Sequence, residues 1–251
     1  MLINLKDADL DKSIYRIISL ERLLELFIIK KNTLVRPTKW PDTFENFILK
    51  SKVRRSSGEI VQYNFFNWMY GQCWTFHNAS DAMWQIYSPN KNNLRIKTTI
   101  RKLRDSLYSA QPYQPEAYCC VGKVKYLGNK GLIGVANSTF DDYGITVGNI
   151  FNSLLIKRKA FLHENEVRAL HMKKSDDQSS ESVYQYEIDP HDFVTQIMID
   201  PRRSYSEYKV IEDVLRKTTG YQGSIKRSLL YTLPKDITLD VTDTFFKEFS
   251  T

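Results

Sequence analysis

The chain has 251 residues, and its 36 Lys and Arg exceed its 29 Asp and Glu, which leaves a formal charge of +7 at pH 7. Hydrophobic residues make up 42% and charged residues 26%, an ordinary globular composition that excludes an acidic, disordered chain. No run approaches the ~20 apolar residues of a membrane span. Residues 1–7 also lack the pattern of a signal peptide. We therefore expect a cytoplasmic protein with no membrane partner.

The first elements predicted are a strand, a helix and a second strand. β-forming residues predict a strand over 13–18. Ser19 is placed to cap a helix over 20–31, where apolar residues recur at helical spacing, and Asn32 is expected to end it in a left-handed conformation. The second strand is expected over 33–37.

Turn residues at 40–46 lead into helical material, and the aromatic-rich segment 61–70 predicts an amphipathic helix that Gly71 ends. Asn78 or Ser80 is expected to cap a short helix. The remaining elements of this part are expected as a buried strand over 72–77, the short helix over 81–87, a strand over 94–100 that runs into a basic helix, and a strand over 118–126.

Four glycines within 129–148 predict a surface excursion, and the absence of G-x-G-x-x-G and G-K-[ST] removes support for Rossmann and Walker-type nucleotide binding. A helical face at 150–155 is expected to end in the basic cluster 157–159. Residues 173–182 predict a polar connection. A capping box at 204–207 opens a helix that Gly220 ends, and further strands are expected over 184–188, 193–199 and 224–233.

Strands and helices are interspersed without regular βαβ repetition. This order predicts an α+β fold with a split, mainly antiparallel β-sheet core and flanking helices. Because no linker divides the sequence, we expect a single domain over 1–251, with surface insertions near 45–70, 127–148 and 173–182.

Cysteines and histidines give no metal pattern. Cys73, Cys119 and Cys120 show no C-x-x-C spacing, and their odd number argues against a disulfide framework. The four histidines are scattered and form no H-E-x-x-H. We expect neither a disulfide nor a metal cofactor.

Glu164, Glu166 and Arg168 alternate with other residues, so a strand would place them on one face. Two neighbouring carboxylates can work as a pair, because like charges raise one pKa while a basic neighbour lowers the other. The alternative interpretation is a solvated strand face on which Arg168 satisfies both acids.

Other polar residues are candidates for ligand binding. Arg16 lies in an apolar strand, so it must reach a carboxylate, a phosphate or water. Thr75 carries a hydroxyl within a strand, although threonine is also a common strand residue. Trp84 and Tyr87 are suited to stack on a flat ring, or else belong to the core.

The basic excess is dispersed, so charge alone leaves nucleic-acid contact and an ordinary solvated surface equally open. If nucleic acid is bound, phosphate contacts are expected from two groups of basic residues, Arg101, Lys102 and Arg104, and Lys157, Arg158 and Lys159. The second group is also typical of a solvated helix end.

The order of these motifs resembles a bacterial family of unknown function that shows an F-N-D-P-F-E turn, a C-F-S strand, an M-W-x-x-Y helix and an E-x-E-x-R strand. The corresponding residues here read W-P-D-T-F-E at 40–45, C-W-T at 73–75, M-W-Q-I-Y at 83–87 and E-N-E-V-R at 164–168. The turn is altered, and Thr75 stands where that family has serine.

The same order resembles the ADP-ribosyltransferase fold, which draws Arg or His from an early strand, Ser, Thr or Tyr from a middle strand and Glu from a late one. This resemblance maps Arg16, Thr75 and Glu166 onto that triad and makes Glu164 the upstream acid. It implies NAD as the substrate, with no metal. An S-T-S middle motif is absent.

The chemistry of NAD⁺ cleavage suits these residue types, because a carboxylate stabilises the oxocarbenium-like ribose that forms when nicotinamide leaves. Glu166 is expected in that role, oriented by Thr75, with Glu164 as base for the incoming nucleophile. Arg16 is expected to hold the pyrophosphate. Tyr15 is expected beside the cofactor, and Trp84 or Tyr87 is expected against nicotinamide.

We therefore expect an NAD-dependent mono-ADP-ribosyltransferase that modifies nucleic acid, with RNA favoured over DNA or protein. The resemblance to transferase toxins implies a toxic or antiphage role and a cognate antitoxin protein. Two alternatives remain open from the residues: a non-enzymatic nucleic-acid-binding module, and a metal-dependent nuclease that uses Glu164, Glu166 and Asp42.

Overall fold

The structure is a computed structural model, and it describes residues 1–40, 42–55, 57–62, 67–111, 113–139, 146–173, 181–233 and 238. The strands are β1 (Leu2–Ile3), β2 (Ser13–Ser19), β3 (Lys31–Val35), β4 (Lys52–Arg54), β5 (Ile60–Gln62), β6 (Met69–Thr75), β7 (Asn93–Thr99), β8 (Cys119–Lys123), β9 (Lys125–Leu127), β10 (Ile156–Arg158), β11 (Glu166–Met172), β12 (Val183–Glu187), β13 (Gln196–Ile199) and β14 (Ser224–Arg227).

The helices include α1 (Leu20–Ile29), α2 (Phe47–Lys50), α3 (Asp81–Tyr87), α4 (Ile100–Ser109), α5 (Pro115–Tyr118), α6 (Asn129–Thr139), α7 (Val147–Ser153), α8 (Pro190–Phe193) and α9 (Tyr205–Thr219). Short 3-10 turns are η1 (Asp7–Asp9), η2 (Pro37–Lys39), η3 (Thr43–Asn46) and η5 (Lys159–Glu164). No helix in the described ranges is long and apolar enough to cross a membrane.

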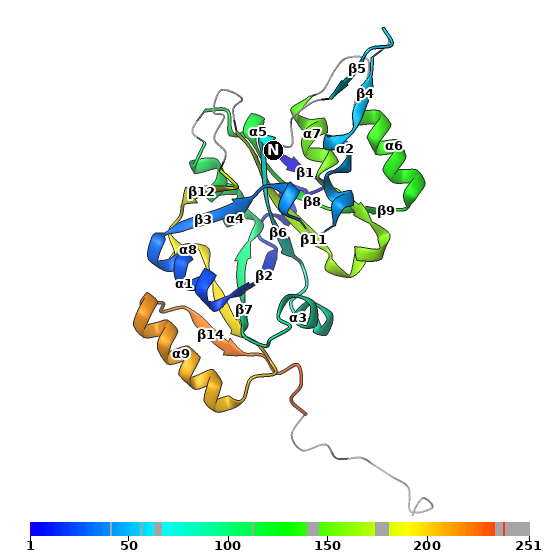
Figure 1. The fold of residues 1–251 in the computed structure, drawn as a ribbon. Coiled ribbons are helices and arrows are strands. Elements are labelled where there is room, and N and C mark those ends of the chain that lie inside the picture. Colours follow the sequence, from blue (N-terminus) through cyan, green and yellow to red (C-terminus); the bar gives the residue numbers. More distant parts are fainter. Residues whose placement is uncertain are drawn as a thin grey trace, which may run out of the picture.

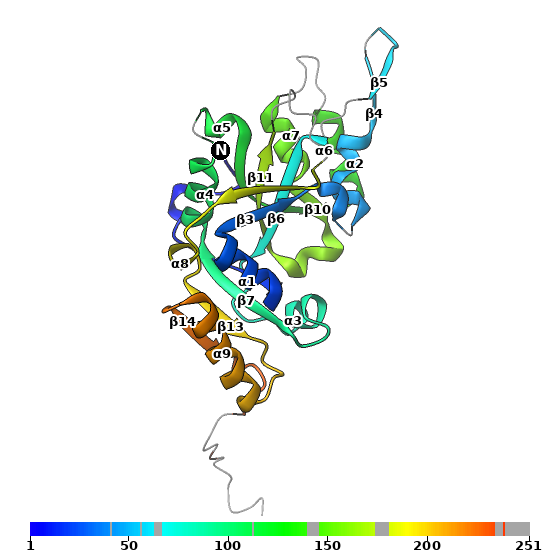
Figure 2. The same cartoon turned by 60° about the vertical axis from the view of Figure 1, so that its left-hand side comes forward.

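Ten strands of the described chain form one sheet, with the main order β1-β8-β11-β6-β2-β7-β13-β14 and with β3 and β12 joined to it through β6. The β1–β8 and β13–β14 pairs are parallel, whereas the other pairs of this sheet are antiparallel. Figures 1 and 2 show α6 and α7 near one end of the sheet, with α9 and β14 at the other. The α+β class with a mainly antiparallel sheet is confirmed.

Two apolar cores cover opposite faces of the sheet, because alternate residues of a strand point to opposite sides. On β11, Val167 and Ala169 belong to the larger core, together with buried residues of α1, α4 and α9. Leu170 belongs to the smaller core, together with residues of α2 and α7. Arg168 has the same parity as Leu170, which places the charged residues of β11 on the α2 and α7 side.

Several predicted elements match closely. Ser19 caps α1 by accepting a hydrogen bond from the Arg22 amide, and Ser80 caps α3. The capping box of Ser204 and Glu207 opens α9, and Gly220 ends it with φ +68°. These signals depend on residues close in the chain, so local chemistry suffices to predict them.

Other predictions are wrong where tertiary contacts decide. Lys30, and not Asn32, is the left-handed residue after α1, while Asn32 lies in β3 with its buried amide bonded to Gln72 and Tyr186. The helix predicted over 61–70 is not formed, because β5 covers 60–62 and β6 begins at Met69, while residues 63–66 lie outside the described ranges.

In the second half, the excursion expected over 129–148 contains α6, with residues 140–145 outside the described ranges. Residues 156–158 form a strand, β10, paired in parallel with β9, so the predicted helix end there is wrong. Strand β11 begins at Glu166, since Asn165 is left-handed with φ +44°. Only 224–227 of the last predicted strand is a strand, and most of the predicted connection 173–182 is not described.

Gly71 on β6 is required by close packing. A Cβ added there would lie 2.6 Å from Cζ2 of Trp40 and 3.0 Å from Cδ2 of Leu170. The Arg168 guanidinium lies 4.5 Å from the Trp40 ring centroid, so the indole cannot move without disturbing that cation. The small residue at 71 therefore lets Trp40 close over the charged face of β11.

We predict that Gly71→Ala lowers the free energy of unfolding by about 1–3 kcal/mol, the usual cost of forcing extra atoms into a packed site. Gly134→Ala in α6 is the matched control, because its Cβ would meet nothing within 4 Å. Alanine favours a helix interior by about 1 kcal/mol over glycine, so the control is expected to stabilise. Urea unfolding of both variants checks the opposite signs, and equal effects contradict the packing argument.

Candidate active site

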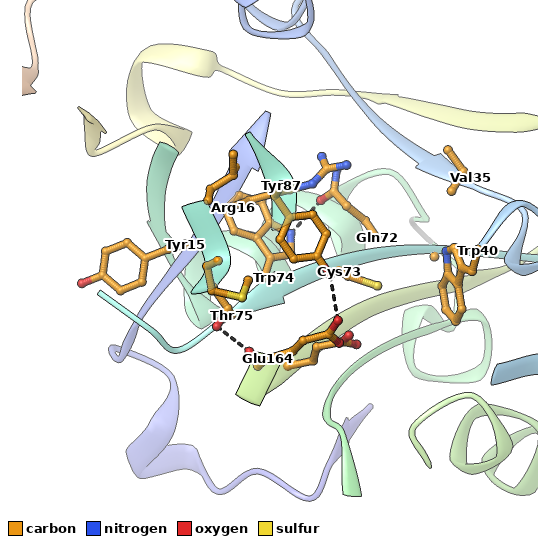
Figure 3. Close-up of a pocket in the computed structure, with 14 residues that line it drawn as sticks. Tyr15, Arg16, Val35, Trp40, Gln72, Cys73, Trp74, Thr75, Tyr87 and Glu164 are labelled. Carbon is orange, nitrogen blue, oxygen red and sulfur yellow. Dashed lines mark hydrogen bonds between the residues drawn. The ribbon is translucent and has the colours of Figure 1, made fainter. Parts of the chain in front are cut away.

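The candidate site lies where the sheet splits between β2, β3 and β6. In the described chain, β2 pairs with β6 only at Tyr15 and Thr75, and β3 pairs with β6 only at Val35 and Gly71. Between these two points the strand edges diverge, and a cavity of about 210 Å³ opens there. Figure 3 shows its walls, which are lined by Tyr15, Arg16, Ile17, Val35, Trp40, Gly71, Gln72, Cys73, Trp74, Thr75, Met83, Tyr87, Glu164 and Glu166.

A buried charge cluster forms one side of this cavity. The Lys157 ammonium contacts three carboxylates, at 2.7 Å from Glu45, 2.7 Å from Glu166 and closer still to Glu164. The Arg168 guanidinium donates at 2.6 Å to the second oxygen of Glu166 and lies 3.3 Å from Glu45. These five side chains are 6% exposed or less. Three acids against two bases leave the cluster with one excess negative charge when all are ionised.

The two acids of the E-x-E motif differ in protonation. Burial and the nearby Glu166 carboxylate raise the pKa of Glu164 to about 7, against the opposing effect of Lys157. Burial alone would raise the pKa of Glu166 too, but the Arg168 and Lys157 cations lower it to about 2. Glu166 therefore stays ionised, while Glu164 exchanges a proton near neutral pH. This is the arrangement of one charged group and one proton-transfer group.

Each carboxylate keeps capacity for a ligand. The Tyr87 phenol donates to Oε1 of Glu164 at 2.9 Å, and Lys157 takes Oε2. Lys157 and Arg168 likewise occupy one oxygen each of Glu166. A carboxylate oxygen has two lone pairs, so both groups can still accept from a hydroxyl that enters the cavity. Figure 3 shows the Tyr87 ring directed at the Glu164 carboxyl group, with a dashed line for the hydrogen bond between them.

Arg16 is the cation of this site that lacks an anionic partner. Its guanidinium makes no hydrogen bond or ion pair with the described residues, although burial lowers its pKa. It lines the first cavity and also a second one, of about 340 Å³, which shares Ile17 and Val35. Arg16 is half-buried and its fork of N–H donors suits a phosphate, so it marks a place for an anion at the wall common to both cavities.

The second cavity has a mixed polar and apolar lining in which basic side chains outnumber acidic ones. It is lined by Arg16, Ile17, Ile18, Ser19, Arg22, Glu25, Leu26, Lys31, Asn32, Thr33, Val35, Asn93, Ile96 and Val183. A buried amide network links the linings of the two cavities: Gln72, which lines the first, donates at 2.7 Å to Asn32, which lines the second, and accepts from the Trp74 indole at 2.8 Å. This network holds β3 beside β6 where the ladder is broken.

Thr75 acts differently from the sequence-based expectation. Its hydroxyl donates at 2.6 Å to the backbone carbonyl of Glu164 and accepts from the His77 amide at 3.1 Å, so it does not orient the Glu166 carboxylate. The reason is register, because Thr75 pairs directly with Glu166 and its side chain meets the turn that precedes β11. Thr75 thereby fixes the position of Glu164.

The expected aromatic residues divide between site and core. Tyr15 and Tyr87 line the cavity, and the Tyr15 ring lies 4.6 Å below the Arg95 guanidinium. Trp84 does not reach the cavity, since it is 1% exposed and packed within the fold. On the short helix α3 only one of the two positions faces the sheet split, which leaves Tyr87 to contact a ligand there.

Few of the expected phosphate contacts are free. The prediction that Lys157 contacts phosphate at the surface is wrong, because its side chain is buried among three acids. Arg158 pairs with Asp42 at 2.9 Å, whereas Lys159 is exposed. The basic residues of α4 lie outside both cavities, and each is in an ion pair, Arg101 with Asp11, Lys102 with Asp192 and Arg104 with Asp105.

Sequence reasoning missed Glu45 and Cys73. Glu45 ends the turn motif and contacts both Lys157 and Arg168. Its place in that motif, beside aromatic residues, is a sequence feature from which a site residue could have been predicted. Cys73 lines the cavity, but burial and the nearby Glu166 charge raise the pKa of its thiol to about 12, which keeps it protonated. No group of three or more His, Cys, Asp or Glu in the described ranges is placed to hold a metal ion.

Comparison with known proteins gives distant structural neighbours. No protein-family model matches the chain, and no curated protein matches it. DarT from Thermus sp. 2.9 in complex with NAD⁺ has 11% identity and a TM-score of 0.41, with 87% of this chain and 96% of that chain covered. Its complex with carba-NAD⁺ gives 12% and 0.40 over the same shares.

A third structure, the same DarT in complex with ADP-ribosylated ssDNA, has 11% identity and a TM-score of 0.41, covering 87% of this chain and 94% of that chain.

The opposite pKa shifts predict a stability maximum. Glu166, lowered from 4.5 to about 2, stabilises the fold above pH 4.5 and loses that effect as pH falls toward 2. Glu164, raised from 4.5 to about 7, stabilises it at low pH and loses that effect as pH rises through 7. We predict that Glu164→Gln, which mimics the protonated acid, flattens the decline between pH 5 and 8 in urea unfolding. An unchanged slope contradicts the assignment.

Proposed function

We propose that this chain is an NAD⁺-dependent mono-ADP-ribosyltransferase that modifies nucleic acid. The observation that carries the proposal is the Arg16 guanidinium, which pairs with none of the described residues and lies on the wall shared by two cavities, one of which also holds the Glu164 and Glu166 carboxylates. A dinucleotide has this layout, because two nucleoside halves are joined by a diphosphate. Arg16 would bind the diphosphate through charge-assisted hydrogen bonds.

The carboxylates favour the first cavity for the nicotinamide half. When the bond between ribose C1′ and the nicotinamide nitrogen breaks, its electron pair neutralises the leaving ring and positive charge develops on the ribose. The ionised Glu166 would stabilise that charge through its field and by accepting from the ribose 2′-hydroxyl. Lys157 and Arg168 hold the carboxylate in one orientation, so little reorganisation is needed at the moment of reaction.

Glu164 would serve the acceptor. Its pKa near 7 allows it to take the proton of the attacking hydroxyl or ring nitrogen as the new bond to C1′ forms. Thr75 fixes its backbone and Tyr87 its carboxyl oxygen, which sets the direction of attack. The Tyr87 ring, which lines the same cavity, would pack against the nicotinamide ring.

A nucleic-acid acceptor is supported by the basic excess of the chain and by the exposed Lys159 beside the acid cluster. The preference for RNA over DNA stays a prediction, since phosphate contacts are common to both. The toxic or antiphage role and the neutralising protein that the resemblance implies stay predictions, since no contact of the described residues bears on them.

The nuclease alternative finds less support in the geometry. Asp42 is turned to Arg158, and the space between Glu164 and Glu166 is taken by the Lys157 ammonium. The positions of these cations oppose a site for a divalent ion that uses the three acids together. A non-enzymatic binding module leaves the unpaired Arg16 and the proton-exchanging Glu164 without a purpose.

We predict that Glu166→Gln lowers nicotinamide release from NAD⁺ by about 100-fold or more, because it removes the charge that stabilises the transition state. Chromatographic measurement of nicotinamide, with RNA, DNA or no added acceptor, checks the prediction. Glu187→Gln, an exposed acid on β12, is the matched control and is expected to keep full activity. Equal release by the wild type and Glu166→Gln overturns the proposed mechanism.

A second prediction concerns the diphosphate. Wild-type protein is expected to bind nicotinamide mononucleotide about 10- to 100-fold more tightly than nicotinamide riboside, which lacks only the phosphate, because hydrogen bonds to charged groups contribute about 1.5–3 kcal/mol. Arg16→Ala should remove this difference in calorimetric titrations. The control variant Arg22→Ala should retain most of the difference in affinity, because Arg22 is already paired with Glu25 at 2.5 Å. A preserved preference in Arg16→Ala contradicts the role of Arg16.

A further inference from the structure

The Arg158 side chain contacts the rings of both Phe44 and Phe161 beside the acid cluster, and we call these three side chains the stacking platform. The Arg158 guanidinium carbon lies 4.4 Å from the Phe44 ring centroid and 5.3 Å from that of Phe161. Phe44 is 49% exposed and the Arg158 side chain 36% exposed, so solvent reaches both. An exposed phenyl ring against a guanidinium plane offers flat surfaces to another flat group.

The platform is held in place by the local structure. Asp42 accepts from the Phe44 amide at 3.1 Å as the cap of η3 and from the Arg158 guanidinium at 2.9 Å. One carboxylate thus fixes two members that are more than a hundred positions apart in the sequence. Because it also neutralises Arg158, the exposed charge beside the platform comes from Lys159, which follows Arg158 in the chain.

The platform adjoins the reacting groups. The Phe161 ring centroid lies 4.6 Å from the Lys157 ammonium, which contacts Glu164 directly. Glu164 in turn ends η5, the turn that carries Phe161. A ligand stacked on the platform therefore lies two side-chain contacts from the carboxylate proposed to accept the proton of the nucleophile.

We propose that this platform binds an unpaired nucleobase of a single-stranded acceptor, with Lys159 at its phosphate backbone. Stacking on aromatic rings and guanidinium planes together with a cationic backbone contact is the usual chemistry of single-strand binding. The inference rests on the proposed function for its acceptor, but the platform residues Phe44, Arg158 and Phe161 are not among those proposed to bind NAD⁺ or to react. A protein acceptor has no base to stack, which makes it an outcome of the test.

Fluorescence anisotropy with labelled 12-nucleotide RNA and DNA, and with abasic strands of equal length and charge, tests the platform. Wild-type protein should bind base-bearing strands about tenfold more tightly than abasic ones, as expected for one stacked base. Phe44→Ala should lose this preference while binding abasic strands unchanged, and Phe44→Trp should keep it. Tyr205→Ala, which removes an aromatic ring 62% exposed on α9, is the matched control.

A second measurement separates this inference from the proposed function. With water as the acceptor, Phe44→Ala should release nicotinamide from NAD⁺ at the wild-type rate. With a dilute oligonucleotide as the acceptor, the same variant should transfer ADP-ribose about tenfold more slowly than the wild type. Loss of nicotinamide release in Glu166→Gln supports the proposed transferase activity, independently of the results with Phe44→Ala. Equal binding of base-bearing and abasic strands by the wild type, an unchanged preference in Phe44→Ala, or transfer to protein without oligonucleotide binding each overturns the platform.

Discussion

The buried ammonium of Lys157 is the interaction on which the site depends. It joins Glu45 from the turn η3, Glu164 from the end of η5 and Glu166 from the start of β11, so three separate segments meet at one charge. Removal of one partner from a buried ion network typically costs about 3–5 kcal/mol, because the remaining charges stay buried and uncompensated. The cluster is therefore costly to build, and two of its acids, Glu164 and Glu166, line the cavity proposed to bind NAD⁺.

The neighbours of each acid in this cluster also give two similar side chains, Glu164 and Glu166, different pKa values. Arg168 reaches Glu166 but not Glu164, so one carboxylate is held ionised and the other exchanges a proton near neutral pH. Two glutamates separated by one residue thus acquire distinct chemistry from their neighbours alone. The proposed mechanism uses this difference, because the ionised Glu166 would stabilise positive charge on the ribose and Glu164 would take the proton of the nucleophile.

The split between β2 and β6 provides the space for a ligand. A single register pair holds these strands together, and beyond it Arg16 lies between two cavities without a counter-ion among the described residues. The Gln72 and Asn32 amides bridge β6 and β3, which share a single register pair in the described chain. A gap in the sheet, an unpaired cation and a pair of unequal acids together account for the proposed use of a dinucleotide.

The sequence by itself determined the features that depend on neighbouring residues: the caps of α1, α3 and α9, the strand that carries Arg16, and the identity of the paired acids at 164 and 166. It also placed Arg168 beside Glu166, because a period of two fixes which strand residues share a face.

Only the tertiary structure decided that Lys157 is buried and Lys159 exposed, since three consecutive basic residues look alike until β10 turns one of them toward the acids. The same holds for Thr75, whose hydroxyl meets the Glu164 backbone rather than the Glu166 carboxylate, and for Trp84, which enters the core while Tyr87 faces the cavity. These outcomes depend on strand register and on charges brought together from distant segments, which no local pattern encodes.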